Sequence, residues 1–365
     1  MDLINTLMKS TNSEFANLVV DGVVGDNIGF IDTGSYALNA LFSGSIFGGI
    51  PSNKIAAFAG PSGVGKTYYA LQVVKAFLDK DPENVVMYFE SESAIDSEVV
   101  KSRGIDPKRM AIVSVATVQE FRHQALKVLL EYEQESSEKE RESPKLLIVL
   151  DSLGNLSTTK EVEDMASGSE KLDMTRSKLI RGTFRVLTLK SGKLNVPFLL
   201  TNHVYDTQST YSTKVMGGGE GLVYAASSIV FLSKTKEKEE KGGPVVGGLL
   251  TALLTKGRLT IEQKKVQTRL FFSSGLDQYY GLVDIAIDAG IFTKFSTKIK
   301  LPDDTTHFRK HIENKPEKYF TPDILRQIDE ACPSLFCYGS DIKEYDEENI
   351  IIPIKPVKDK STSDK

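Results

Sequence analysis

The chain has 365 residues, of which 40% are apolar and 26% are charged. These proportions are typical of a globular protein and exclude disordered, collagen-like and disulfide-scaffold chains. With 45 basic and 49 acidic side chains, the formal net charge is −4, which excludes a positively charged coat over the whole surface. Any contact with a polyanion such as nucleic acid must therefore be local.

The chain contains only two cysteines, Cys332 and Cys337, which is typical of a reducing compartment. Residues 1–10 contain no basic patch followed by an apolar stretch, so we predict no signal peptide. The longest apolar runs are much shorter than the roughly 20 residues that a membrane helix needs. We expect a cytoplasmic protein that does not contact a membrane.

Short runs rich in β-forming residues recur along the chain and are mostly apolar without alternation, which is typical of strands covered on both faces. Longer segments with helical periodicity lie between them. The predicted strands are 55–59, 85–89, 112–115, 146–150, 198–201, 229–233, 249–255 and 269–272. The predicted helices are 68–78, 121–130 and 174–189.

This alternation predicts an α/β fold with a mostly parallel sheet and helices on both faces. After Ser227 the strands follow one another directly, so we expect an antiparallel edge, with an exposed turn at 234–243. We assign the main core to 31–290, a small C-terminal region to 291–340 and a flexible, charged tail to 341–365. Residues 1–30 form a short N-terminal arm.

The arm carries apolar residues at helical spacing, namely Leu3, Leu7 and Phe15. Such a helix either docks on a neighbouring subunit or covers the chain's own core.

A phosphate-binding loop is predicted between the first strand and the first helix of the core. Residues 60–67 match the pattern G-x-x-x-x-G-K-[ST], in which backbone N–H groups surround the phosphates of a nucleotide. Lys66 would neutralise charge on the β and γ phosphates of ATP, and the Thr67 hydroxyl would bind Mg²⁺. The residues predicted to bind nucleotide here are Gly60, Pro61, Ser62, Gly63, Val64, Gly65, Lys66, Thr67 and Tyr68.

Two further carboxylates follow predicted strands. Asp151 comes directly after 146–150 and is the expected second ligand of Mg²⁺ in the nucleotide site, although an aspartate there can also cap the next segment. Glu92 follows 85–89 and is our candidate for activating the attacking water. Glu90 competes for that role, and we prefer Glu92 because it lies farther beyond the strand.

His203 ends the next predicted parallel strand, beside the same crevice. It can donate to the γ phosphate of a bound nucleotide, but on position alone a loop histidine without a special role is equally compatible with the sequence.

Several motifs in one order resemble the RecA recombinase family. The stretches that carry the resemblance are 31–41, 48–51, 90–96, 104–106, 151–152 and 214–219. Residues 151–155, 173–176 and 215–219 are most similar to the UvsX-type strand-exchange recombinases of T-even-like phages. The resemblance spans about 31–290 and implies a RecA-like P-loop ATPase core; if a phage encodes the chain, it would act in the host cytoplasm.

The resemblance also implies roles for individual residues. Glu92 matches the family's catalytic glutamate, and His203 stands where the family usually has a glutamine that senses the γ phosphate. Lys256 and Arg258 match two cations that reach the nucleotide of the neighbouring subunit in a filament, whereas on the sequence alone they are equally compatible with a solvated strand end.

The adenine-binding part of the family pattern matches this sequence only partly. Asp96 corresponds to a residue near the adenine, but Val99 stands where the family has a stacking tyrosine.

The resemblance implies that two loops face DNA, at about 155–171 and 204–219, and neither is basic. By composition alone both are surface loops. Their Ser, Thr, Tyr and Gly content suits sequence-independent backbone contacts. The predicted DNA contacts are Lys160, Lys171, Tyr205, Tyr211, Lys214, Gly217, Gly218 and Gly219.

The resemblance implies an ATP-dependent recombinase that forms helical filaments on single-stranded DNA and exchanges it with homologous double-stranded DNA. Its expected further partners are a single-strand-binding protein and a recombination mediator. Two alternatives remain open. A hexameric DNA helicase shares the ATPase core, but it would usually carry an N-terminal domain for which the residues before Ile31 leave no room. A regulatory ATPase of the same fold would bind protein instead of DNA.

Overall fold

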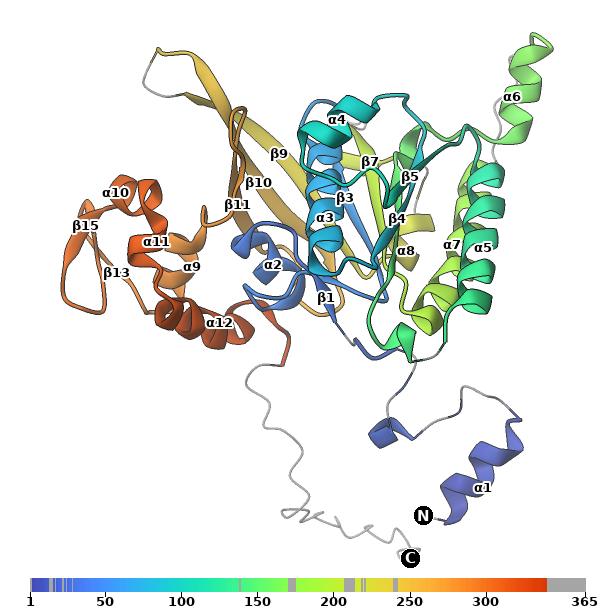
Figure 1. Ribbon diagram of the computed structural model, residues 1–365, viewed down its shortest axis with the longest axis horizontal. Coiled ribbons are helices and arrows are strands. Elements are labelled where there is room, and N and C mark those ends of the chain that lie inside the picture. The colour runs from blue at the N-terminus through green and yellow to red at the C-terminus, as the bar shows by residue number, and fades with distance from the viewer. Residues whose placement is uncertain are drawn as a thin grey trace, which may run out of the picture.

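The computed structural model describes residues 2–12, 16, 18–21, 23, 25–27, 29–137, 139–169, 175–206, 214–217, 219, 221–238 and 242–339. Within this part of the chain, a ten-stranded sheet has the order β12-β11-β10-β9-β3-β7-β6-β4-β5, with β8 beside β7 (Figure 1). Its strands are β3 (Ile55–Gly60), β4 (Val85–Glu90), β5 (Met110–Ser114), β6 (Leu146–Asp151), β7 (Phe198–Asp206), β8 (Lys214–Met216), β9 (Ser228–Lys238), β10 (Val245–Gly257), β11 (Lys265–Phe271) and β12 (Gly275–Asp277).

The sheet combines a parallel body with an antiparallel edge. Strands β5, β4, β6, β7, β3 and β9 pair in parallel, whereas β9, β10, β11 and β12 pair antiparallel. The predicted α/β fold is therefore confirmed. The turn expected at 234–243 is wrong in its first half, because β9 continues as a strand to Lys238.

Helices cover both faces of the sheet because the buried strands are apolar on both sides. On β3, Ala56 and Phe58 face a cluster that includes α2 (Tyr36–Ser43) and α3 (Lys66–Lys80). Ile55, Ala57 and Ala59 face the opposite cluster, which includes α5 (Val118–Glu135) and α7 (Arg176–Leu194) (Figure 1). The other helices of the core are α4 (Ser97–Ser102), α6 (Thr159–Ala166), α8 (Gly221–Ala225) and α9 (Leu282–Asp288), with 3-10 turns η2 (Glu140–Glu142) and η3 (Leu153–Asn155). A further 3-10 turn, η1 (Val19–Asp21), lies in the N-terminal arm.

The first predicted DNA loop contains regular structure. Helix α6 begins with a capping box in which the Thr158 side chain accepts from the Glu161 N–H and the Glu161 carboxylate accepts from the Thr158 N–H. Such reciprocal bonds satisfy two otherwise free donors of the first turn and stabilise the helix start. The expectation of an irregular loop is therefore wrong over Thr159–Ala166.

The C-terminal region packs against the start of the core. It consists of β13 (Thr293–Phe295), β14 (Lys298–Lys300), β15 (Thr306–Phe308), α10 (Arg309–Asn314), α11 (Pro316–Tyr319) and α12 (Pro322–Phe336). The Asp329 carboxylate on α12 accepts from the Ser45 hydroxyl at 2.6 Å and from the Ile46 N–H at 2.8 Å. The predicted tail at 341–365 lies outside the described residues.

The N-terminal segment contains α1 (Asp2–Ser10), which lies apart from the sheet in Figure 1, while β1 (Phe30–Ile31) pairs with β2 (Ile50–Pro51). Leu3 is 72% exposed and Leu7 56% exposed, so neither side chain is buried against the chain's own core. Phe15 lies outside the described residues. In the described part of the chain, no helix is both long and apolar enough to span a bilayer.

Phe58 offers a test of the core, because it is fully buried between α2 and α3. Its ring lies 5.8 Å from that of Phe42 and 5.6 Å from that of Tyr69. Replacing Phe58 with Ala removes these contacts and leaves a cavity, so we expect the free energy of unfolding to fall by about 3–5 kcal/mol in urea titrations. The control Phe295→Ala, at a 65% exposed ring, should change it by less than about 0.5 kcal/mol. Equal losses in the two variants would contradict this account.

Candidate nucleotide and DNA site

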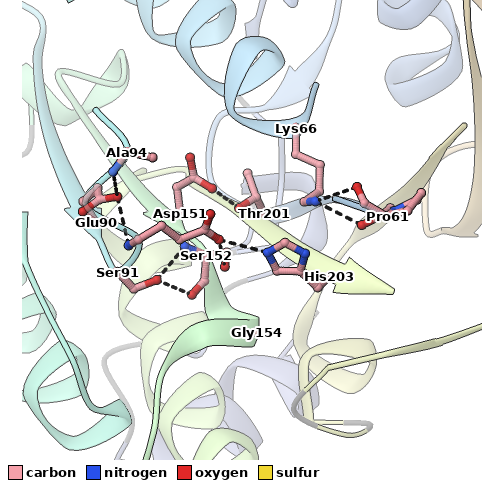
Figure 2. A network of polar contacts seen from close by, with 12 residues as sticks. Pro61, Lys66, Glu90, Ser91, Ala94, Asp151, Ser152, Gly154, Thr201 and His203 are labelled. Carbon is pink, nitrogen blue, oxygen red and sulfur yellow. Dashed lines mark hydrogen bonds and ion pairs between the residues drawn. The ribbon is translucent and has the colours of Figure 1, made fainter. Parts of the chain in front are cut away.

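The pairing register of the parallel strands places the predicted site residues together at the carboxyl ends of these strands. In the parallel ladders, Gly60 of β3 lies opposite His203 of β7, and Glu90 of β4 lies opposite Asp151 of β6. The carboxyl ends of four neighbouring strands therefore open onto one crevice, which is where ligands bind in open α/β sheets. Figure 2 shows Lys66, Asp151 and His203 facing this region.

The phosphate loop has the backbone conformation that its glycines permit. Gly63 and Gly65 have φ values of +71° and +111°, which side chains disfavour. Gly65 precedes the first turn of α3, so the N–H groups at that helix start point into the loop. Pro61 and Ser62 are exposed, whereas Val64 is buried.

Lys66 is the buried cation of this loop. Its Nζ donates to the carbonyl oxygens of Gly60 at 3.0 Å and Pro61 at 3.1 Å. Burial lowers the pKa of the Lys66 ammonium, and the negative charges of Glu92 and Asp151 oppose that shift only in part. A bound phosphate would balance the charge of the Lys66 ammonium, so the residues present fit a nucleoside triphosphate.

Asp151 is held by two hydroxyl donors. The Tyr88 hydroxyl donates to Oδ2 at 2.8 Å, and the Thr201 hydroxyl donates to Oδ1. Burial, together with the charge of Asp151, raises the pKa of Tyr88 well above its ordinary value, so Tyr88 remains a donor. Thr67 lies in the first turn of α3 and supplies a second oxygen of the type that Mg²⁺ prefers.

The two candidate glutamates have different environments. The Glu90 carboxylate is buried and accepts from the N–H groups of Glu92, Ser93 and Ala94 at 2.7–2.9 Å, so it holds the turn after β4. The Glu92 carboxylate instead accepts from the Ser152 hydroxyl at 2.6 Å and lies 2.9 Å from His203 Nε2. Burial opposes the charge on Glu92, but the hydrogen bonds from Ser152 and His203 lower its pKa below the usual range.

His203 connects this cluster to the start of the second predicted DNA loop. Its ring contacts Glu92, while its carbonyl oxygen accepts from the Gly217 N–H at 2.9 Å. The Asn202 side-chain amide donates to the Gly217 carbonyl at 2.9 Å. A change at the His203 ring is therefore linked to the backbone of β8 and Gly217 by direct contacts.

Comparison with known proteins now gives the family. The model of the RecA N-terminal domain matches residues 4–277. The "Recombination and repair protein" of Enterobacteria phage T4 is 30% identical over 80% of this chain and 72% of its own length. "Protein RecA" of Thermus aquaticus is 24% identical over 72% of this chain and 73% of its own length, and that of Thermotoga neapolitana is 25% identical over 72% and 70%. The chain belongs to the RecA family.

Members of this family are DNA-dependent ATPases that act in recombination, bind DNA and form filaments. The resemblance found in the sequence, the ATPase activity and the recombinase class are thereby confirmed at the level of the family.

Three other predicted residues of this RecA-family core lie at the start of α4 and at the end of β10. Asp96 caps α4, because its Oδ1 accepts from the N–H groups of Glu98 and Val99. Lys256 lies at the end of β10 and Arg258 directly after it, and their side chains donate to the carbonyl oxygens of Val223 and Tyr224.

These two cations lie beside the beginnings of the parallel strands, whereas the phosphate loop of their own subunit lies at the carboxyl ends of these strands. Lys256 pairs with Ile229, and the Arg258 N–H donates to the Ser227 carbonyl, so both lie beside the beginning of β9. Strand β9 begins where β3 begins, because Ser228 pairs with Ala56. The structure therefore does not bring Lys256 and Arg258 together with Lys66.

The predicted DNA contacts are described only in part. Lys160 is exposed in the first turn of α6, and Tyr205 on β7 is 58% exposed. Lys214 pairs with Asp206 in the short β7–β8 ladder. Gly217 lies against His203 as described, and Gly219 has a φ of +75°. Lys171, Tyr211 and Gly218 lie outside the described residues.

Four residues that shape the site are not marked by any of the sequence motifs as site residues, namely Tyr88, Ser152, Thr201 and Asn202. Ser152, Thr201 and Asn202 adjoin or nearly adjoin Asp151 and His203, so their positions after buried strands were a usable signal. Tyr88 lies within a buried apolar run, where nothing in the sequence distinguishes it from a core residue.

The Glu92 environment predicts a shift in pH dependence. Ser152→Ala removes a donor to the Glu92 carboxylate, which stabilises its charged form, so the pKa of Glu92 should rise. If Glu92 must be charged for hydrolysis, the acidic limb of the ATPase rate profile moves to higher pH. Ser334→Ala, on the exposed side of α12, serves as the control and should leave the profile unchanged. A profile that does not move in Ser152→Ala would contradict this dependence.

Proposed function

We propose that the chain is an ATP-dependent recombinase that polymerises on single-stranded DNA and pairs it with homologous double-stranded DNA. The observation that carries the proposal is that the phosphate loop, Glu92 and the second DNA loop all adjoin His203, which pairs with Gly60. Lys66, Glu92 and His203 share one crevice, and His203 bonds Gly217 through its backbone. In this arrangement, nucleotide state and DNA-loop position are able to influence each other.

In the proposed hydrolysis, Glu92 orients the attacking water and accepts its proton. The Glu92 carboxylate is charged at neutral pH and a quarter exposed, so it is accessible to water. Lys66 stabilises the charge that develops on the phosphoryl oxygens. Glu90 is unsuited to the same role, because three backbone N–H groups already occupy its oxygens.

Thr67 and Asp151 would hold Mg²⁺ in this proposal. A hydroxyl and a carboxylate are the oxygen donors that Mg²⁺ prefers. Asp151 ends β6 at the crevice, and Thr67 lies in the first turn of α3. The ion would supply neutralisation of phosphate charge when bound.

Lys256 and Arg258 would serve the nucleotide of the neighbouring subunit. Both cations lie beside the beginnings of β9 and β3, whereas Lys66 lies beyond the end of β3. This separation supports the role, because a head-to-tail filament places two different sides of adjacent subunits in contact. Burial and the nearby Arg258 charge lower the pKa of Lys256, and a phosphate across the interface would favour its charged form.

Single-stranded DNA would lie on the two loops, contacted by Lys160, Tyr205 and Lys214 together with Lys171, Tyr211 and Gly217–219. Tyrosine side chains provide stacking surfaces for bases, and backbone amides contact phosphates without reading sequence. A single-strand-binding protein and a recombination mediator are further proposed partners. Action in the cytoplasm of a host cell is part of the same proposal.

Electron microscopy with ATP and single-stranded DNA separates the proposal from its alternatives. Open helical filaments support the recombinase, whereas closed rings would support a hexameric helicase. Hydrolysis that DNA does not stimulate would support a regulatory ATPase.

The first functional prediction separates binding from chemistry. Lys66→Ala should abolish both nucleotide binding and hydrolysis, because it removes the cation of the phosphate loop. Glu92→Gln should still bind nucleotide but lower the hydrolysis rate by about 100-fold or more, because it removes the carboxylate that accepts the proton of water and leaves the phosphate loop intact. Steady-state hydrolysis and nucleotide titration measure both quantities. Glu90→Gln is the matched control, and a near-parental rate in Glu92→Gln would return the role to Glu90.

The second functional prediction tests action across the interface. The double variant Lys256→Ala/Arg258→Ala should bind ATP normally but lose DNA-stimulated hydrolysis. Mixing it with Lys66→Ala protein creates interfaces that join an intact phosphate loop to intact cations, so part of the hydrolysis should return. Mixtures that remain inactive although both variants assemble on DNA would show that the cations act within their own subunit.

A further inference from the structure

A third cation lies beside Lys256 and Arg258 at the beginnings of the parallel strands. Lys54 directly precedes Ile55, the first residue of β3, and its side chain is half-buried. The Ile55 carbonyl accepts from the Ser227 N–H at 2.7 Å, and the Ser227 carbonyl accepts from the Arg258 N–H at 3.0 Å. Two backbone hydrogen bonds thus lead from the residue after Lys54 to Arg258.

The charges of these side chains act on one another, so Lys54, Lys256 and Arg258 form one group, which we call the basic cluster. Burial lowers the pKa of the Lys54 ammonium, the charge of Arg258 lowers it further, and Asp26 opposes this shift only in part. Burial and the same Arg258 charge lower the pKa of Lys256, where Glu262 opposes the shift in part. Each ammonium therefore lacks a sufficient countercharge within its own subunit.

The members of the basic cluster form no ion pair with a carboxylate in the described part of the chain. Their side chains donate to backbone carbonyl oxygens instead, that of Lys54 to Gly25 at 2.5 Å. Lys145, directly before β6 at the same end of the sheet, pairs with the carboxylates of Asp81 at 2.7 Å and Glu83 at 3.0 Å. An ammonium has three N–H donors, so Lys54 keeps donors available for an anion.

The basic cluster suits an anion with several charges, because it brings like charges together without a carboxylate partner. A nucleoside triphosphate carries several negative charges on adjacent phosphates, whereas each phosphodiester of DNA carries one. The predicted DNA loops also lie at the other ends of the strands, because they follow Asp151 of β6 and His203 of β7. The position and the charge of the basic cluster therefore favour a triphosphate over DNA.

We infer that Lys54 is a third cation that contacts the triphosphate of the neighbouring subunit, together with Lys256 and Arg258. The inference rests on the proposed function, since it takes the latter two cations to act across the filament interface. The Lys54 ammonium donates to a phosphate oxygen of the neighbour's nucleotide and stabilises the negative charge that develops there during hydrolysis. Its hydrogen bond to the Gly25 carbonyl restrains the ammonium before that contact forms.

The first test separates the charge of Lys54 from its hydrogen bond to Gly25. Lys54→Gln keeps a donor but loses the charge, so DNA-stimulated hydrolysis should fall about tenfold or more while unassembled protein binds ATP as the parent does. Lys54→Arg keeps the charge and should retain most of the rate. Lys265→Gln, which removes an exposed cation of β11 outside the basic cluster, is the control and should leave the rate unchanged.

Filament stability gives a readout that does not depend on hydrolysis. With a non-hydrolysable ATP analogue, filaments of Lys54→Gln should disassemble at a lower salt concentration than those of the parent, because a charged contact across the interface is lost. Light scattering during a salt titration measures this concentration. A parental hydrolysis rate or a parental disassembly concentration in Lys54→Gln would overturn the inference.

Mixtures of variants show on which side of the interface Lys54 acts. Lys54→Gln mixed with Lys66→Ala creates interfaces that join an intact phosphate loop to an intact basic cluster, so hydrolysis should rise above that of either variant. Lys54→Gln mixed with Lys256→Ala/Arg258→Ala should stay low, because both variants carry the defect on the same side.

Each opposite result has a defined meaning. If the first mixture stays low although both variants assemble on DNA, or if the second mixture recovers, Lys54 acts within its own subunit and the inference is overturned. Parental DNA-stimulated hydrolysis in Lys256→Ala/Arg258→Ala alone would instead overturn the proposed role of those two cations.

Discussion

Parallel neighbours in a sheet end at the same edge, and in this chain β4, β6, β7 and β3 are four such neighbours. The polar residues after each of these strands are therefore forced into one crevice, although more than 100 residues separate Glu92 from His203. The strands can run in parallel only because both of their faces are apolar and covered by helices. The site thus depends on the packing of residues that never touch a ligand.

The same constraint explains how the crevice and the second DNA loop share atoms. His203 is the last residue of β7 that pairs with β3. Its ring contacts Glu92 in the crevice, while its carbonyl oxygen accepts from the N–H of Gly217, directly after β8. Asn202, fully buried beside it, fixes the returning Gly217 through its amide. The ring of His203 thus belongs to the crevice and its backbone to the second DNA loop, so this one residue joins the two surfaces directly.

Much of this arrangement follows from local sequence signals. The phosphate loop and the apolar strand before Asp151 could be predicted from order and spacing, and the preference for Glu92 over Glu90 stays a prediction. Other features depend on contacts that spacing does not encode. The hydroxyl of Tyr88 on β4 donates to Asp151 on the neighbouring strand β6. Arg103, directly after α4, lies over the ring of Tyr68 on α3. The segment at 234–238 has charges typical of a turn, but pairing with β10 keeps it extended as β9.

The separation of Lys256 and Arg258 from their own phosphate loop has a consequence for short assemblies. In the proposed filament, each complete site is built from two subunits, so a row of subunits contains one fewer complete site than it has members. One terminal subunit carries a nucleotide that no neighbour helps to cleave, and the other terminus presents unused cations. The average rate of ATP hydrolysis per subunit should therefore increase with filament length. The two ends of a filament should also differ in nucleotide state, because one terminal subunit keeps its triphosphate longest.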